Sequence, residues 1–205
     1  MNKKNSILEY LKECFPNPTC ELNYTCDYEL LISIMLSAQT TDKKVNIVTK
    51  ELFKKYDSIE KLATANKKDI IEIIKSIGFA NKKSNFVIEI AKIINNGADL
   101  KKREVLESMP GVGRKTASVF LSEFYEIPNI AVDTHVHRFS KRMGIIKETD
   151  DVLICEQKLK IFFDEKDYNR MHLTIVLFGR YICKSKNPDC NDCKLKSYCK
   201  YWQKK

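Results

Sequence analysis

The sequence predicts an all-α fold of roughly ten helices, on two observations. Apolar residues recur three or four positions apart along nearly the whole chain, which is the spacing of one face of an α-helix. No segment shows the strict alternation of a half-buried strand bounded by turn residues, and there are only six glycines and five prolines. With 205 residues, of which 43% are hydrophobic, the chain is long enough for one large domain or two compact lobes.

Four stretches carry the helical spacing most clearly. They are Ile7/Leu8/Leu11, Val45/Val48/Leu52, Ile70/Ile71/Ile74/Ile77 and Phe86/Val87/Ile90/Ile93/Ile94. Asp57 with Glu60 resembles a capping box at a helix start, and Gly78 and Gly97 lie where helices should end. No polar linker or repeat is visible, so two lobes would be joined by short connections, one of them at residues 126–129.

The charge balance points to a polyanionic partner. Lys and Arg number 36 against 27 Asp and Glu, which gives a formal net charge of +9. Cations that neutralise phosphates release condensed counterions, so a basic chain favours nucleic acid, although many basic proteins never bind it. The N-terminus lacks the features of a signal peptide, and the longest apolar run, Leu30–Leu36, is too short to span a bilayer. We expect a soluble, cytoplasmic protein with no membrane segment.

Four of the eight cysteines gather near the C-terminal end, with the spacing Cys183-x6-Cys190-x2-Cys193-x5-Cys199. Four thiolates this close in sequence can hold one soft metal centre, either a zinc ion or an iron–sulfur cluster. Zinc ribbons usually contain two Cys-x2-Cys pairs, whereas this segment has one pair flanked by single cysteines, which favours a cluster. The remaining cysteines lack metal-binding spacing and are expected to be free structural thiols; they are Cys14, Cys20, Cys26 and Cys155.

Lysines follow the same segment. Lys184 and Lys186 lie between the first two cysteines, and Lys194, Lys196 and Lys200 come after them. A loop stapled by a metal centre and displaying lysines predicts a rigid phosphate-binding surface. The alternative is an ordinary solvated face.

Residues 106–117, with the sequence LESMPGVGRKTA, predict a helical hairpin. Pro110 ends the first helix, Gly111 and Gly113 permit a tight turn, and a second apolar helix begins at about Arg114. Free N–H groups at that helix start can bind a phosphate, aided by the helix dipole. The spacing is not that of a P-loop, and no strand precedes it. A plain helix–turn–helix connection without a ligand would also use glycine.

Lys115 and Asp133 are the two candidates for chemistry. The helix dipole favours Asp or Glu in a first turn, so a second cation beside Arg114 is unusual there. Lys115 is either a phosphate-binding lysine or an amine nucleophile. Asp133 follows an apolar stretch and stands where a helix N-cap belongs. It is a cap, a carboxylate that assists Lys115, or both.

With these motifs in place, the chain resembles the endonuclease III family of bacterial glycosylase/lyases, which act on thymine glycol and other oxidised pyrimidines. The hairpin, the segment IAVDTH at residues 130–135 and the four cysteines occur in the order and spacing of that family. The similarity extends from PTCEL at residues 18–22 through LSAQTTD at residues 36–42 to Cys199.

The resemblance implies two α-helical lobes. Residues 22–129 would form a six-helix barrel containing the helix-hairpin-helix motif, at about residues 106–117. Residues 1–21 and 130–205 would form a helical domain whose loop, residues 183–199, carries a structural 4Fe-4S cluster on Cys183, Cys190, Cys193 and Cys199. The protein is expected to be a monomer, associated with the nucleoid, that binds double-stranded DNA with damaged bases or abasic sites.

The resemblance also assigns roles to single residues. Lys115 would attack C1′ of a flipped-out nucleotide and displace the damaged base, and the resulting Schiff base would cut the strand by β-elimination. Asp133 would assist the nucleophile and the charge on the sugar. Gln39 and Phe79 match the positions that fill the vacated stack, with a surface helix cap and a core aromatic as their structural alternatives. The remaining DNA contacts would be Gly111, Val112, Gly113, Arg114, Lys184 and Lys186.

Departures and alternatives remain. Ala80, Ser118 and Lys194 replace residues that are frequent in the family, and Ala80 puts the preferred lesion in doubt. The adenine-mismatch glycosylases share the fold but place a catalytic Glu in the helix equivalent to residues 30–38, where this chain has Ser33, and they generally lack the lysine at position 115. A monofunctional glycosylase for mismatched thymine or uracil is a second alternative, which the presence of Lys115 disfavours. A DNA-binding module without catalysis is a third possibility, which the presence of Lys115 and Asp133 disfavours.

Overall fold

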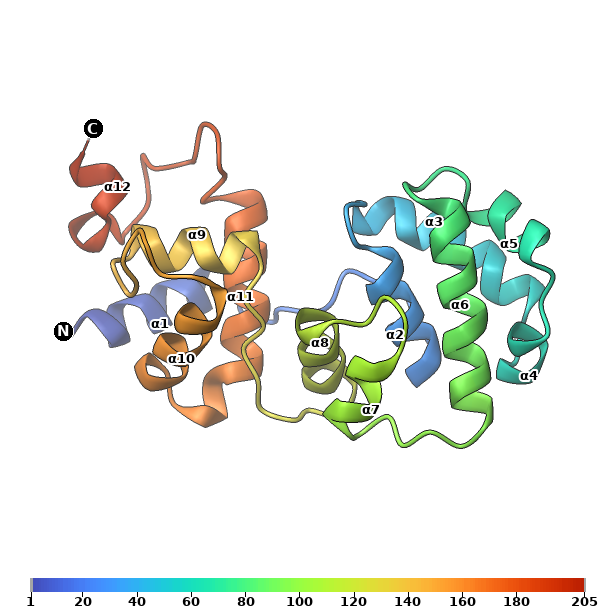
Figure 1. Cartoon of the computed structure of the whole chain (residues 1–205). Helices are drawn as coiled ribbons and strands as arrows, with labels where there is room; N and C mark the ends of the chain where they lie inside the picture. Colours follow the sequence, from blue (N-terminus) through green and yellow to red (C-terminus); the bar gives the residue numbers. More distant parts are fainter. Residues whose placement is uncertain (1, 205) are drawn as a thin grey trace. The chain divides into compact units, whose positions relative to one another are not determined.

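The computed structural model describes residues 2–204 and confirms the all-α fold. These residues form twelve α-helices and two 3-10 turns, and they contain no strand (Figure 1). The sequence predicted roughly ten helices, which is fewer than the structure contains, because some helices are very short: α4 has five residues and α12 has four. Elements this short show no repeating apolar spacing. Contacts along the chain divide it into two units, Cys20–Tyr125 and Met1–Thr19 with Glu126–Lys205.

The unit Cys20–Tyr125 is organised around one buried helix. Its elements are α2 (Asp27–Leu36), α3 (Asp42–Lys55), α4 (Ile59–Ala63), α5 (Lys67–Ile74), α6 (Ala80–Asn95), α7 (Arg103–Ser108) and α8 (Arg114–Phe124). Seven consecutive residues of α2, Leu30–Leu36, are buried, because α3, α6 and α8 all pack against this helix (Figure 1). The longest apolar run of the sequence is therefore a central core helix.

The second unit joins the N-terminal helix to the C-terminal half of the chain. Its helices are α1 (Lys3–Cys14), α9 (Thr134–Arg142), α10 (Val152–Phe162), α11 (Tyr168–Tyr181) and α12 (Lys200–Gln203), with 3-10 turns at Glu165–Asp167 and Lys196–Tyr198. Helix α11 packs against both α1 and α9 (Figure 1). Ile7 and Leu11 of α1 are fully buried in the same core as Phe139 and Phe178.

Two local predictions about helix ends were wrong. The cap of α4 is Ser58, whose side chain accepts from the N–H of Lys61, whereas Asp57 forms an ion pair with the Lys61 ammonium at 2.7 Å. Helix α5 ends at Ile74, so Ile77 lies outside it, and the left-handed residue that follows is Phe79 and not Gly78. Neighbouring candidates of similar chemistry can exchange these roles, and sequence alone does not rank them.

Within residues 2–204, no helix is both long and apolar enough to cross a membrane.

Candidate functional site

The hairpin between α7 and α8 turns at a glycine whose replacement would strain the backbone and crowd a neighbouring side chain. Gly111 has φ +79°, and a Cβ placed on it would lie 2.5 Å from Cδ2 of Phe86. The N–H of Val112 donates to the carbonyl of Met109 at 3.1 Å, and the Val112 side chain is buried. The turn therefore needs both the left-handed conformation and the missing side chain of Gly111.

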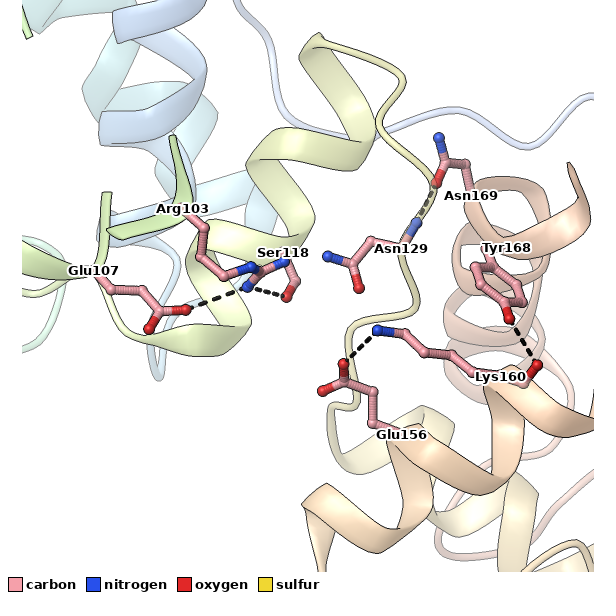
Figure 2. Close-up of polar contacts among 8 residues, drawn as sticks. All are labelled: Arg103, Glu107, Ser118, Asn129, Glu156, Lys160, Tyr168 and Asn169. Atoms are coloured by element: carbon pink, nitrogen blue, oxygen red, sulfur yellow. Dashed lines mark hydrogen bonds and ion pairs between the residues drawn. The ribbon is translucent and has the colours of Figure 1, made fainter. Parts of the chain in front are cut away.

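A polar bridge ties the two helices of the hairpin together (Figure 2). Nη1 of Arg103, on α7, donates to Oγ of Ser118 on α8 at 3.0 Å and lies 3.2 Å from Oε1 of Glu107. Ser118 is buried, and this contact gives its hydroxyl oxygen the hydrogen-bond partner that a buried polar group needs. From the sequence, Ser118 was only a departure from the family pattern. The structure gives it a bracing role.

The start of α8 has the features of an anion site. Its N-cap, Gly113, supplies no side-chain hydrogen bond, and the first turn contains no acidic residue. The first N–H groups of a helix have no partner within the helix, so they are available to an anion when no side chain caps them. A Cβ on Gly113 would meet nothing within 4 Å, so this glycine leaves open space outside the helix start. Arg114 and Lys115 are both exposed there.

Asp133 is the N-cap of α9, which confirms the capping role considered from the sequence. Its Oδ1 accepts from the backbone N–H groups of His135 and Val136, both at 2.8 Å. Among the described residues, no backbone N–H group donates to the other carboxylate oxygen, Oδ2. The residue is half-buried, so the second oxygen can serve another group. Lys115 belongs to the unit Cys20–Tyr125 and Asp133 to the other, and each is placed within its own unit.

The extended segment that leads to Asp133 is anchored by α11. Nδ1 of the buried His172 lies 2.9 Å from the carbonyl oxygen of Ala131, a contact that requires Nδ1 to donate. The N–H of Asn129 donates to Oδ1 of Asn169 at 2.9 Å (Figure 2). Sequence reasoning missed both α11 residues, because their contacts lie about forty positions away in the chain.

Gln39 and Phe79 share an uncommon backbone conformation. Their φ angles are +58° and +62°, in the left-handed region that residues other than glycine rarely adopt. Both side chains are exposed, Phe79 by 64%. The alternative of a core aromatic at Phe79 is therefore wrong. Ala80, which follows it, is the first residue of α6 and is half-buried.

The four cysteines of the C-terminal segment are free thiols, as are the other four. Burial raises the pKa of the Cys193 thiol; a hydrogen bond from the Leu195 backbone opposes that change, and the neighbouring Cys183, Cys199 and Cys190 add to it. All four thiols are thus near enough to interact electrostatically. Within residues 2–204, no three His, Cys, Asp or Glu side chains come together as a single-ion ligand set.

Arg142, on α9, holds the beginning of this segment. Its Nη1 donates to the carbonyl oxygens of Cys183 at 3.2 Å and Lys184 at 2.9 Å, and it lies 3.1 Å from Sγ of Cys183. Burial raises the pKa of the Cys183 thiol, and the contact with Arg142 opposes that change. Arg138, one turn earlier, donates from Nε to the same Cys183 carbonyl at 3.1 Å. Neither arginine was singled out from the sequence.

The lysines of the segment divide into two groups. Lys184 and Lys186 are exposed, and in the described part of the chain their ammonium groups contact no acceptor. Lys194 instead binds Glu13 of α1, with Nζ 2.6 Å from Oε1, and Lys196 donates to the Asn191 carbonyl. Lys184, Lys186 and the exposed Lys200 thus remain candidates for the proposed phosphate-binding surface, and Lys194 links the segment to α1.

Comparisons with known proteins agree on one family. The model of the HhH-GPD superfamily of base excision DNA repair proteins matches residues 32–164. Endonuclease III of Rickettsia felis is 41% identical over 201 residues, which cover 97% of this chain and 94% of the relative. Endonuclease III of Bacillus subtilis is 40% identical over 201 residues, covering 97% and 92%.

The solved structures point the same way. A trapped endonuclease III–DNA covalent intermediate matches 100% of this chain and 99% of its own, with a TM-score of 0.92 and 38% identity. The chain thus shares its helical fold with a solved endonuclease III, and its curated relatives match it over nearly their full length. Its hairpin leads into a helix start without a side-chain cap. The chain belongs to the endonuclease III family within the HhH-GPD superfamily of base excision DNA repair proteins.

Proposed function

We propose that this base excision repair glycosylase and abasic-site lyase removes oxidised pyrimidines from duplex DNA, using Lys115 as its nucleophile. The observation that carries the proposal is the setting of Lys115. It is an exposed amine in the first turn of α8, beside a helix start that has no side-chain cap and no acidic residue. A phosphate bound at that helix start brings the sugar of the substrate within reach of the amine.

The chemistry consumes and then regenerates the lysine. The neutral amine of Lys115 attacks C1′ of the damaged nucleotide, the glycosidic bond breaks, and the base leaves with the bonding electrons and takes up a proton. Opening of the sugar ring gives a Schiff base between Nζ and C1′. Loss of a proton from C2′ then expels the 3′ phosphate, which cuts the strand, and water hydrolyses the Schiff base to release the lysine.

Asp133 supports both steps through one oxygen. Its Oδ1 is engaged by two N–H groups, which fixes the orientation of the carboxylate. Oδ2 is then available to accept the proton that Lys115 must lose, and to stabilise the positive charge that develops on the sugar.

The DNA contacts are proposed on the geometry of the hairpin, on exposure and on charge. The hairpin residues Gly111, Val112, Gly113 and Arg114 bind a backbone phosphate, and Lys184 and Lys186 bind a second stretch of backbone. Gln39 and Phe79 fill the space that the flipped nucleotide vacates. Residues 22–129 would then form the barrel domain, which carries the nucleophile. Residues 1–21 and 130–205 would form the other domain, which carries Asp133 and the cluster segment, residues 183–199. The protein acts as a monomer.

The cluster segment fits a 4Fe-4S cluster on Cys183, Cys190, Cys193 and Cys199. All four donors are free thiols, and soft thiolate ligands select iron–sulfur centres. Thiolate ligands bring negative charge, and the Arg142 guanidinium lies against the first of them. When bound to the four cysteines, the cluster would cross-link and rigidify the loop that carries Lys184 and Lys186. Purified protein should contain about four irons per chain; one zinc in a colourless, active protein would contradict the assignment.

Duplexes that each carry one defined lesion test the function. With an oxidised pyrimidine, the strand should be cut without alkali, because the lyase step follows base release. A G·T mismatch should be a poor substrate, and a preformed abasic site a good one. Base release that yields strand breaks only after alkali would instead identify a monofunctional glycosylase.

A further inference from the structure

Lys83 is a buried lysine that the chemistry above does not use. It is 5% exposed, and its Nζ donates to the carbonyl oxygens of Leu36 and Ala38, both at 2.8 Å, and to Oγ1 of Thr40 at 3.4 Å. Burial lowers the pKa of this amine. In residues 2–204 no carboxylate pairs with it. Burying an ammonium without a counter-ion is costly, and a methionine of similar length would avoid that cost. The donors of Lys83 must therefore have a task.

The acceptors of Lys83 lie at the end of α2 and on both sides of Gln39. Leu36 is the last residue of α2, and the last carbonyls of a helix have no partner within it. Ala38 and Thr40 flank Gln39, whose backbone is left-handed. The ammonium thus closes the turn from both sides, which holds Gln39 in a conformation that a free loop would rarely adopt.

The main chain of Lys83 reaches the second left-handed residue. Its N–H donates to the carbonyl oxygen of Phe79 at 2.9 Å, as does the N–H of Lys82 at 3.0 Å. These are the first hydrogen bonds of α6, which begins at Ala80. One residue therefore binds Phe79 through its backbone and the turn around Gln39 through its side chain.

We propose that Lys83 is a positioning residue that fixes Gln39 relative to Phe79, so that the two side chains enter the DNA stack as one rigid wedge. This inference rests on the proposed function, which assigns those two side chains to the vacated stack. Opening the stack costs free energy, and mobile loops would also lose conformational entropy on insertion. Loops held in place before DNA binding avoid that second cost.

Lys83→Met tests the proposal, because methionine has a similar length and no donor. The matched control is Lys92→Met, which removes the same charge near the other end of α6, where Lys92 pairs with Glu89 on the surface. Full-length proteins are compared for thermal unfolding, and for binding to a duplex with a tetrahydrofuran abasic-site analogue beside 2-aminopurine. The fluorescence of 2-aminopurine rises when its neighbours unstack. Single-turnover rates are measured on a duplex lesion and on a single-stranded abasic site.

We expect Lys83→Met to lose most of the fluorescence rise and to slow the duplex reaction by roughly tenfold or more relative to the single-stranded one, as the loss of charge-assisted hydrogen bonds predicts. Lys92→Met should match wild type. Equal losses on duplex and single strand, or a wild-type fluorescence rise, would overturn the inference while the proposed function stood. If wild type itself cuts no lesion, the proposed function fails first. If Lys83→Met does not unfold cooperatively, Lys83→Gln, which keeps a neutral donor, takes its place. The ratio of its duplex rate to its single-strand rate is then compared with that of wild type.

Discussion

At the scale of single residues, the two oxygens of Asp133 allow folding and chemistry to be separated. Oδ1 caps α9, and asparagine can do the same with its amide oxygen. Asp133→Asn should therefore keep the unfolding midpoint close to that of wild type and reduce turnover by ~10²–10⁴, the usual contribution of general acid–base help. Asp133→Ala should in addition lose about 1 kcal/mol of stability with the cap. Steady-state rates and thermal unfolding measure both. An active Asn variant would leave Asp133 as a cap only.

Glu123 gives a pH-dependent prediction at the same scale. Burial raises the pKa of its carboxyl, and hydrogen bonds from Tyr24 Oη, at 3.3 Å, and from the Cys20 backbone oppose the change only in part. The folded state then binds the proton more tightly than the unfolded chain, so stability falls as pH rises from the ordinary glutamate pKa, about 4.3, through the raised folded value.

Glu123→Gln should accordingly raise the unfolding midpoint at pH 8, and the gain should shrink towards pH 4. Chemical denaturation across this range measures the effect. Glu51→Gln, on the exposed side of α3, is the control. A gain that is independent of pH would show that the charge on Glu123 does not cause it.

At the scale of elements, the hairpin glycines are predicted to differ. Gly111→Ala places a Cβ 2.5 Å from Phe86 on a backbone with φ +79°, and should destabilise the protein by about 2 kcal/mol or more. Gly113→Ala meets no atom within 4 Å and has an extended backbone, so it should cost less, about 0.5–1 kcal/mol, because alanine is a poorer N-cap than glycine. Its methyl group should nevertheless weaken DNA binding. Full DNA affinity in a stable Gly113→Ala protein would contradict a phosphate site at the start of α8.

Elements also show where sequence reasoning stops. The start of α8 and the cap at Asp133 were predictable, because the residues that specify them are adjacent in the chain. The contacts of Arg142 with Cys183 and of Lys83 with Leu36 join positions more than forty residues apart. No periodicity encodes such pairs. Even a local feature failed where Asp57 and Ser58 competed for one cap.

At the scale of the whole molecule, the net charge of +9 predicts steeply salt-dependent binding to undamaged duplex DNA. Lys184→Ala and Lys186→Ala should each make the dependence of log affinity on log salt shallower by about one unit. Lys194→Ala is the matched control, because that exposed lysine already binds Glu13. Fluorescence anisotropy at several salt concentrations gives the slopes. Equal slopes for all variants would remove the cluster segment from the DNA surface.

Borohydride trapping with Lys115→Gln tests the central claim most directly. Glutamine keeps nearly the length and the hydrogen bonding of the side chain but lacks the amine that a Schiff base requires. The variant should fold, contain iron like wild type and bind a stable abasic-site analogue. With an abasic duplex and borohydride, wild type should form a covalent protein–DNA complex and Lys115→Gln should form none. Trapping of Lys115→Gln at the wild-type rate would show that another amine is the nucleophile, and would contradict the account.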